Sequence, residues 1–284
     1  MVVQQHARQA AAARAAAAAV AAATVMAGAA GCGGGAEAGD RNGDPTRLVR
    51  QAADRLVREG SSQARTSMEM ASGGTRVTIR GEGVYDYRKG LGELKVQLPP
   101  DAAGTDEHRP ITELLAPGAL FMKNRGAGVP ADKWVRVETA SLTDGNLVTG
   151  GATDPLAAAE LLRGAEDVTY VGESDVAGVA TRHYRGTVDL AAAAKGASAG
   201  SKGALAAAAK GFGTSASVPF DAYLDDDGLL RKVRHRFSFA NTQQKNGLRN
   251  TVVASTTLLY GFGRPAVVRL PQKKDIYAGE VAEK

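Results

Sequence analysis

Few residues in this sequence could carry covalent or metal chemistry. The 284 residues include one cysteine, Cys32, and four histidines, which are His6, His108, His183 and His235. A single cysteine excludes a disulfide framework, an iron–sulfur cluster and a cysteine-rich zinc site. The histidines are far apart in the sequence, whereas a zinc site needs two or three ligands at close spacing. We therefore expect no metal site.

His235 and one acidic run are the remaining chemical candidates. His235 alternates with apolar residues in a strand-like pattern, so we expect a pocket or core imidazole there. The run Asp225–Gly228 lacks the alternating ligands and the closing Glu of an EF-hand, and it indicates a hairpin turn instead. The sequence has no GxSxG, P-loop or SxxK motif. We expect a protein that is not an enzyme and has no cofactor, with a secreted hydrolase as the enzymatic alternative.

The segment before Cys32 is typical of a secretory signal. Residues 1–31 contain two arginines and no acidic residue, and they end in a small, apolar run of about 16 residues, Ala15–Ala30. The alternative is a transmembrane helix, but the run is too short and too rich in alanine to predict one. Its end, Ala29-Ala30-Gly31-Cys32, resembles a bacterial lipobox, although the first position of a lipobox is more often Leu.

The lipobox resemblance implies a lipid anchor. In bacterial lipoproteins a diacylglyceryl group is attached to the sulfur of this cysteine, and cleavage before it makes the cysteine the new N-terminus. Two acyl chains are sufficient for stable membrane anchoring. We therefore expect a lipid-anchored protein on the extracytoplasmic face of the cell membrane. The alternative is an exported protein in which Cys32 has no such role.

Composition and charge exclude several classes of protein. Hydrophobic residues make up 44% of the chain and charged residues 23%, which excludes disordered and collagen-like proteins. Aromatic residues make up only 5%, so the core must consist mainly of Val, Leu and small residues. The net charge is +5, but basic residues alternate with acidic ones and form no cluster. We expect no binding to nucleic acid.

The sequence predicts one domain behind a flexible tether. The expected organisation is a signal peptide at 1–31, a tether at 32–44, a single domain at 45–275 and a C-terminal tail at 276–284. Two helices are predicted by an Asp-Pro start followed by apolar periodicity, one at 45–58 and one at 155–162. The Ala/Gly-rich insert 191–217 is predicted to be a mobile excursion, with a short helix at 204–210 as the alternative.

Alternating apolar residues predict about nine or ten strands. The fold class expected is α+β, with a strongly curved antiparallel sheet, an open or half barrel, wrapped around two or three helices. Gly81 and Gly83 interrupt one long strand and indicate a bend or a bulge. The strands are expected at 62–72, 75–88, 94–98, 120–123, 133–138, 168–173, 179–190, 218–224, 229–239 and 251–262.

Four segments carry a resemblance to a known family. They are Lys133–Val135 around the single tryptophan, the hairpin 171–184 with VGE and GVATRHY, Val218–Val233 (VPFDAYLDDDGLLRKV) and Tyr260–Pro271 (YGFGRPAVVRLP). With the lipobox, they resemble the mycobacterial LppX/LprAFG lipoproteins, which have a LolA/LolB-like fold. The resemblance implies a curved sheet around helices, with an apolar cavity for the acyl chains of lipids or glycolipids. The insert 191–217 departs from the compact family pattern.

The strand alternation also supplies a candidate lipid pocket. A filled half-barrel would show the same pattern, so the alternative is a non-enzymatic envelope interaction or sensor module with a filled core. The expected function is a membrane-anchored lipoprotein, a monomer, that binds and carries lipid or glycolipid acyl chains. The pocket residues expected are Met68, Met70, Val77, Ile79, Tyr85, Leu94, Val96, Leu98, Met122, Tyr184, Val188, Phe220, Leu224, Phe237 and Phe239.

Overall fold

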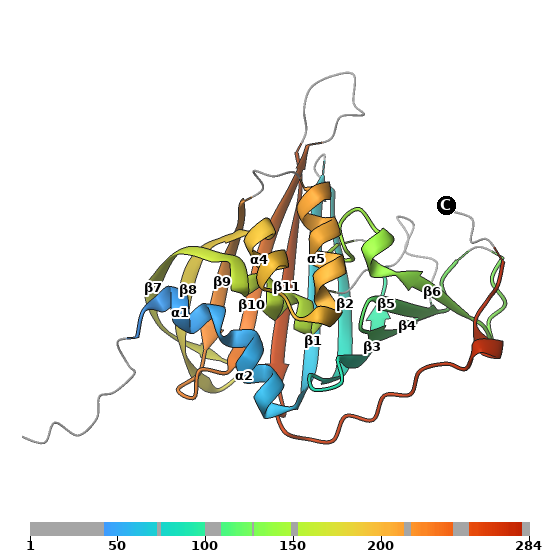
Figure 1. Cartoon of the computed structure of the whole chain (residues 1–284), viewed down its shortest axis with the longest axis horizontal. Coiled ribbons are helices and arrows are strands. Elements are labelled where there is room, and N and C mark those ends of the chain that lie inside the picture. Colours follow the sequence, from blue (N-terminus) through green and yellow to red (C-terminus); the bar gives the residue numbers. More distant parts are fainter. Residues whose placement is uncertain are drawn as a thin grey trace, which may run out of the picture. The chain divides into compact units, whose positions relative to one another are not determined.

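A single antiparallel sheet dominates the fold. The computed structural model describes residues 43–72, 75–99, 109–126, 128–148, 153–212, 217–240 and 250–279. Within these residues, eleven strands pair in the order β6-β5-β4-β3-β2-β1-β11-β10-β9-β8-β7, and the two ends of the sheet do not pair with each other (Figure 1). The strands are β1 (Ser61–Ser72), β2 (Thr75–Asp86), β3 (Leu91–Gln97), β4 (Ile111–Ala116), β5 (Ala119–Lys123), β6 (Trp134–Glu138), β7 (Ala165–Val176), β8 (Val179–Asp189), β9 (Ser217–Leu224), β10 (Leu230–Ala240) and β11 (Asn250–Tyr260).

The sheet consists of two meanders joined at its centre. Strands β1 to β6 form one meander and β7 to β11 form the other. Their junction is the pair β1–β11, whose register runs from Gln63 opposite Tyr260 to Ala71 opposite Val252. The predicted open α+β half-barrel is therefore confirmed. The junction brings together two segments that are far apart in the sequence.

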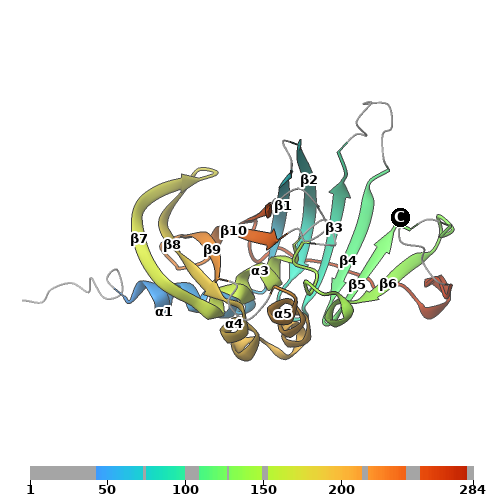
Figure 2. The ribbon, with the colours of Figure 1, turned by 90° about the horizontal axis from the view of Figure 1, so that it is seen from above.

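Helices cover one face of this sheet (Figures 1 and 2). We call the covered side the inner face and the opposite side the outer face. The predicted Asp-Pro starts are confirmed, because Asp44 accepts the N–H of Thr46 and Asp154 accepts the N–H of Leu156. The helices are α1 (Pro45–Arg50), α2 (Ala52–Glu59), α3 (Pro155–Leu161), α4 (Leu190–Gly196) and α5 (Ala199–Gly211), with short 3₁₀ turns η1 (Thr139–Ser141), η2 (Leu162–Gly164) and η3 (Lys273–Asp275).

The insert 191–217 is mostly helical, so the predicted mobile excursion is wrong, and the alternative helix at 204–210 lies within a longer one. Helices α4 and α5 occupy most of it. The side chain of Asp189 caps α4 by accepting the N–H of Ala192 at 2.6 Å. Ala193, Leu205 and Ala208 are buried. Alanine has the best helix propensity, and burial of these small side chains outweighs the cost of the glycines.

Most of the predicted strands are confirmed, and one strand was missed. Strand β4 lies between the expected strands 94–98 and 120–123, where the alternation predicts no strand. Gly81 and Gly83 do not form a bulge, because the register of β2 is continuous with both neighbouring strands. Gly83 instead allows a close approach, since a Cβ there would overlap the backbone carbonyl of Glu93 on β3.

Gly83→Ala should therefore lower stability more than an ordinary glycine substitution. The added methyl would push β3 away, and overpacking of this kind costs about 1–3 kcal/mol. The matched control is Gly203→Ala in α5, where a Cβ would lie 3.4 Å from the Cβ of Ala140, and helix propensity favours alanine by up to about 1 kcal/mol. Urea titration of the two variants measures both effects. Equal stability of Gly83→Ala and wild type would contradict the close approach.

The two edge strands differ from the interior ones. On β6, Trp134 forms a parallel bridge with Ile276, and its carbonyl accepts the N–H of Tyr277 at 2.8 Å. On β7 the register shifts twice, and Asp167 and Gly172 have φ angles of +50° and +147°. Neither edge is a straight strand with all of its hydrogen-bonding groups unpaired.

Candidate functional site

The predicted pocket residues belong to the inner face of the sheet. The hydroxyl of Tyr85 on β2 donates to the Asp154 carboxylate at 3.2 Å, directly before α3. The ring of Phe237 on β10 lies 5.3 Å from that of Phe212, at the C-terminal end of α5. The same alternation therefore points toward the helix layer in both meanders.

Most of these residues are buried in one continuous apolar cluster. Met70, Val77 and Leu98 are half-buried and pack against it. Strand β10 also contains Phe239, whose side chain lies outside the described residues. The fully or nearly fully buried members are Met68, Ile79, Tyr85, Leu94, Val96, Met122, Tyr184, Val188, Phe220, Leu224 and Phe237.

Polar side chains interrupt the apolar inner face at its centre. Thr66 on β1 lies opposite Thr257 on β11, and His235 on β10 lies opposite Ser255 on β11. All four are buried. The hydroxyl of Ser255 is 2.5 Å from that of Thr153, which donates to the Leu147 carbonyl. We call Thr66, Ser255, Thr257 and His235 the central polar cluster.

Three members of this cluster have an unpartnered polar atom. The hydroxyl oxygens of Thr66 and Thr257 and the Nε2 of His235 have no hydrogen-bond partner within the described part of the chain. Burial lowers the pKa of His235 to about 3, so the imidazole is neutral at physiological pH. The expectation of a pocket or core imidazole is thus met by its position on the inner face.

A second unpartnered group on the inner face is Glu113 on β4. The residue is fully buried between Leu94 on β3 and Met122 on β5. Neither carboxyl oxygen has a hydrogen-bond partner among the residues that the structure describes. Burial raises its pKa to about 8, against a smaller opposing effect of the charge on Arg125. The carboxyl is therefore protonated at neutral pH.

The outer face carries the charges. Asp221 on β9 is buried and accepts hydrogen bonds from His183 at 2.8 Å, Arg185 at 3.0 Å and Arg236 at 2.9 Å. Burial alone would raise the pKa of Asp221, but these hydrogen bonds and charges hold it below its usual value. Its donors come from two other strands, so this carboxylate links β8, β9 and β10 from outside.

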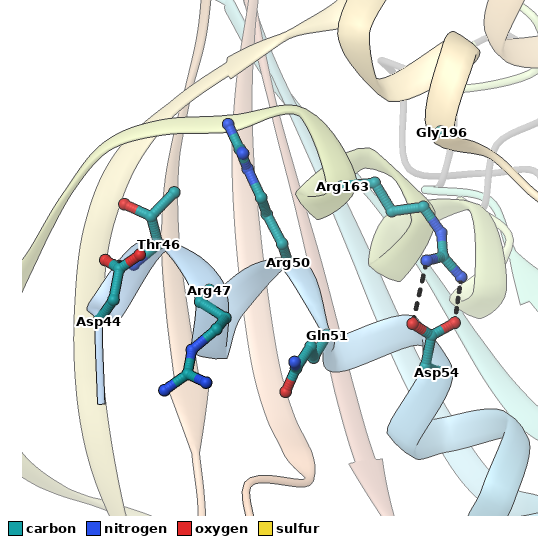
Figure 3. Close-up of a pocket in the computed structure, with 8 residues that line it drawn as sticks. All are labelled: Asp44, Thr46, Arg47, Arg50, Gln51, Asp54, Arg163 and Gly196. Atoms are coloured by element: carbon teal, nitrogen blue, oxygen red, sulfur yellow. Dashed lines mark hydrogen bonds and ion pairs between the residues drawn. The ribbon is translucent and has the colours of Figure 1, made fainter. Parts of the chain in front are cut away.

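A polar pocket of about 390 Å³ lies beside the start of α1 (Figure 3). Arg163 lines it on one side, with a bidentate ion pair to Asp54 on α2 and a second pair to the buried Glu160. The hydrogen bond from Arg163 holds the pKa of Asp54 below its usual value. No sequence pattern indicates this pocket, because Arg163 and Asp54 are far apart in the chain. Its lining residues are Asp44, Thr46, Arg47, Arg50, Gln51, Asp54, Arg163 and Gly196.

A pocket of about 290 Å³ lies near the other end of the sheet and includes Leu98. The other predicted residues whose side chains are described line neither pocket and pack instead with one another and with the helices. The residues described include no group of His, Cys, Asp or Glu side chains able to hold a metal ion. The helices in the same ranges are all too short or too polar to cross a membrane. Cys32 and the leader lie outside the described residues.

No family model matches the chain, and no curated protein matches it. Among solved structures, it is similar to lipoprotein LppX from Mycobacterium tuberculosis, with 11% identity, a TM-score of 0.43 and coverage of 79% of this chain and 97% of that one. LprF from Mycobacterium bovis has 13% identity, a TM-score of 0.41 and coverage of 80% and 96%. A LolA superfamily protein from Nitrosomonas europaea has 11% identity, a TM-score of 0.32 and coverage of 82% and 97%. All three structures are less than 15% identical to this chain, with TM-scores below 0.5.

Proposed function

We propose that this protein binds and carries the acyl chains of a lipid or glycolipid on the inner face of its sheet. The observation that carries the proposal is the composition of the two layers. Apart from the central polar cluster, the inner face is apolar from β3 to β9, and the buried side chains of α4 and α5 in the helix layer are alanines and two leucines, Leu190 and Leu205. A layer of small side chains makes few dispersion contacts per residue, so its displacement by a ligand costs little.

The energetics favour a long apolar ligand. Each methylene group removed from water contributes about 0.8 kcal/mol, so one long acyl chain supplies about 10 kcal/mol before ordering costs. The open sheet needs no break in its hydrogen-bonded ladder to admit such a chain, because only the helix layer has to move. The ligand would then replace contacts that the helices make with the inner face.

The proposal includes a membrane anchor on Cys32. A diacylglyceryl group on Cys32 and the Gly-rich tether up to residue 44 would hold the domain at the extracytoplasmic face of the cell membrane. Lipid could then pass between this membrane and the inner face without a soluble intermediate. The expected species is a monomer without a cofactor, and its role is binding rather than catalysis.

The second candidate is an envelope interaction or sensor module with a filled core. It is favoured by the packing of most predicted pocket residues in one cluster, and of these residues only Leu98 lines one of the pockets described above. In that case the loops rather than the inner face would recognise a partner. The two candidates differ in whether the inner face accepts a ligand.

A pair of tryptophan substitutions separates the candidates. Val77→Trp with Val96→Trp should abolish binding of the fluorescent fatty acyl probe dansylundecanoic acid while changing the melting temperature little, because the added rings occupy the ligand's space. Val96 lies beside Gly81, which has no side chain to clash with the new ring. In a filled core the same pair would overpack at about 1–3 kcal/mol per site.

The matched control is Val252→Trp, at an outer-face position that is 38% exposed. It should bind the probe like the wild type and melt at the same temperature. Failure of the wild-type protein to bind the probe after solvent extraction, together with a large drop in melting temperature of the paired variant, would overturn the lipid-carrier proposal and support the filled core.

A further inference from the structure

The central polar cluster occupies the place where a lipid-binding face should be most apolar. Strands β1 and β11 are in the middle of the sheet order, and β10 is next to them. Directly opposite residues on neighbouring strands have Cβ atoms about 4.5–5.5 Å apart. Thr66, Thr257 and His235 therefore present two hydroxyls and one imidazole within one small area of the inner face.

Small residues surround this area. Gly81 on β2 lies opposite Thr66. Val233 on β10 lies opposite Thr257, and Ala222 on β9 lies opposite Val233. On the other side of His235 are two aromatic rings, with centroids 6.4 Å and 6.1 Å away in Phe220 and Phe237. The polar groups thus lie near small residues on one side and beside two aromatic rings on the other.

Buried polar atoms without partners are rare, and each one needs an explanation. Thr66, Thr257 and His235 are 5%, 1% and 1% exposed, so solvent does not satisfy them. Valine would fill either threonine position without an unpaired hydroxyl, since its shape is nearly the same. Two such hydroxyls and an imidazole nitrogen together point to a group that is bound there when the inner face is occupied.

We propose that Thr66, Thr257 and His235 form an internal binding site for a hydroxyl group carried by the lipid ligand. This inference rests on the proposed function and adds a specificity to it. A hydroxyl group both donates and accepts hydrogen bonds, as the two threonine hydroxyls do, and an imidazole nitrogen can do either. One ligand hydroxyl can therefore pair with several of these atoms.

The surrounding charges exclude an anionic headgroup at this site. The arginines next to the cluster in sequence, Arg65, Arg234 and Arg236, point to the outer face, where they pair with Glu82, Glu69 and Asp221. Buried without a cation, a carboxylate or phosphate would bear its full desolvation cost. The low pKa of His235 agrees with this, because its imidazole supplies no positive charge.

The experiment compares two ligands of equal length in wild type and in the double variant Thr66→Val with Thr257→Val. Both 1-dodecanol and 1-chlorododecane compete with dansylundecanoic acid. The ratio of their affinities is compared between the two proteins, so that the different solubilities of the two ligands cancel. We expect the ratio of dodecanol to chlorododecane affinity to fall about tenfold in the double variant, because two neutral hydrogen bonds are lost. The melting temperature of this variant should be equal to or above that of wild type.

The matched control is Thr256→Val, one residue from Thr257 on the outer face of β11, and it should leave the ratio unchanged. An unchanged ratio in the double variant, with the probe still bound, overturns this inference and leaves the proposed function standing. A large fall in the melting temperature of the double variant also overturns it, because the hydroxyls would then have partners in the empty protein. Absence of binding of the probe to wild type overturns the proposed function and this inference together.

Discussion

Replacement of Glu113 by glutamine is expected to make the protein progressively more stable than wild type as the pH rises from 5 to 9. The folded-state pKa of about 8 lies above the ordinary value of 4.5, because burial disfavours the charged carboxylate. The stabilisation from the protonated carboxyl is complete below about pH 4.5 and is lost as the pH rises through about 8. The gain in free energy of unfolding should reach on the order of 3–5 kcal/mol.

Urea titrations of both proteins at several pH values measure this effect. The difference in free energy of unfolding between the two proteins isolates the effect of Glu113, because Asp154 and His235 titrate in both proteins. Burial raises the pKa of Asp154 to about 6 and lowers that of His235 to about 3. The control is Glu173→Gln, at an exposed position on β7. Its difference from wild type in free energy of unfolding should not grow with pH. A constant difference across the pH range for Glu113→Gln would contradict the buried, unpartnered carboxyl.

Cys32→Ser should release the protein from the membrane completely. Cys32 is the one cysteine of the chain, so no other residue can form the thioether to a diacylglyceryl group. Two acyl chains give stable anchoring, and their loss leaves no comparable membrane contact. The measurement is the distribution of protein between membrane pellet and supernatant after a salt wash, with incorporation of labelled palmitate as a second readout.

The control for the anchor is Gly35→Ser in the tether, which should remain in the pellet and incorporate palmitate. The domain of the Cys32→Ser protein should melt at the wild-type temperature, because Cys32 precedes the helices and strands of the domain. Persistence of Cys32→Ser in the washed membrane pellet would contradict the lipobox interpretation and favour an uncleaved, membrane-inserted leader.

Local patterns in the sequence predict most elements of the fold but not their partners. Asp44-Pro45 and Asp154-Pro155 predict both helix starts because capping and the proline act within one turn. The alternation through Met68 and Ile79 predicts a common inner face because the two-residue period of a strand is also local. The pairing of β1 with β11 depends on packing between distant segments, and no local pattern specifies it. The insert was misinterpreted because glycine and serine lower helix propensity, while burial of Ala193 and Leu205 acts only in the folded protein.

The candidate site shows the same division. Its apolar members follow from strand alternation, but Thr66 and Thr257 are ordinary strand residues, and nothing in the sequence indicates that their hydroxyls are unpartnered. Glu113 was missed because β4 was missed, and a single glutamate in a strand is usually solvated. Whether a buried polar group has a hydrogen-bond partner depends on the side chains that surround it, so this can be determined only after the fold is known.

The two edges of the sheet bear on how copies of the protein behave at high local concentration. An open sheet with free edges can grow by adding a strand from another copy, and natural proteins block this route. At β6 the carbonyl of Trp134 is already used by Tyr277, and the bridge to Ile276 covers the same position. At β7 the bulges around Asp167 and Gly172 twist the strand away from a straight template. If the proposed anchor crowds copies of the protein at a membrane, these two edges should keep the copies separate without closing the sheet into a barrel.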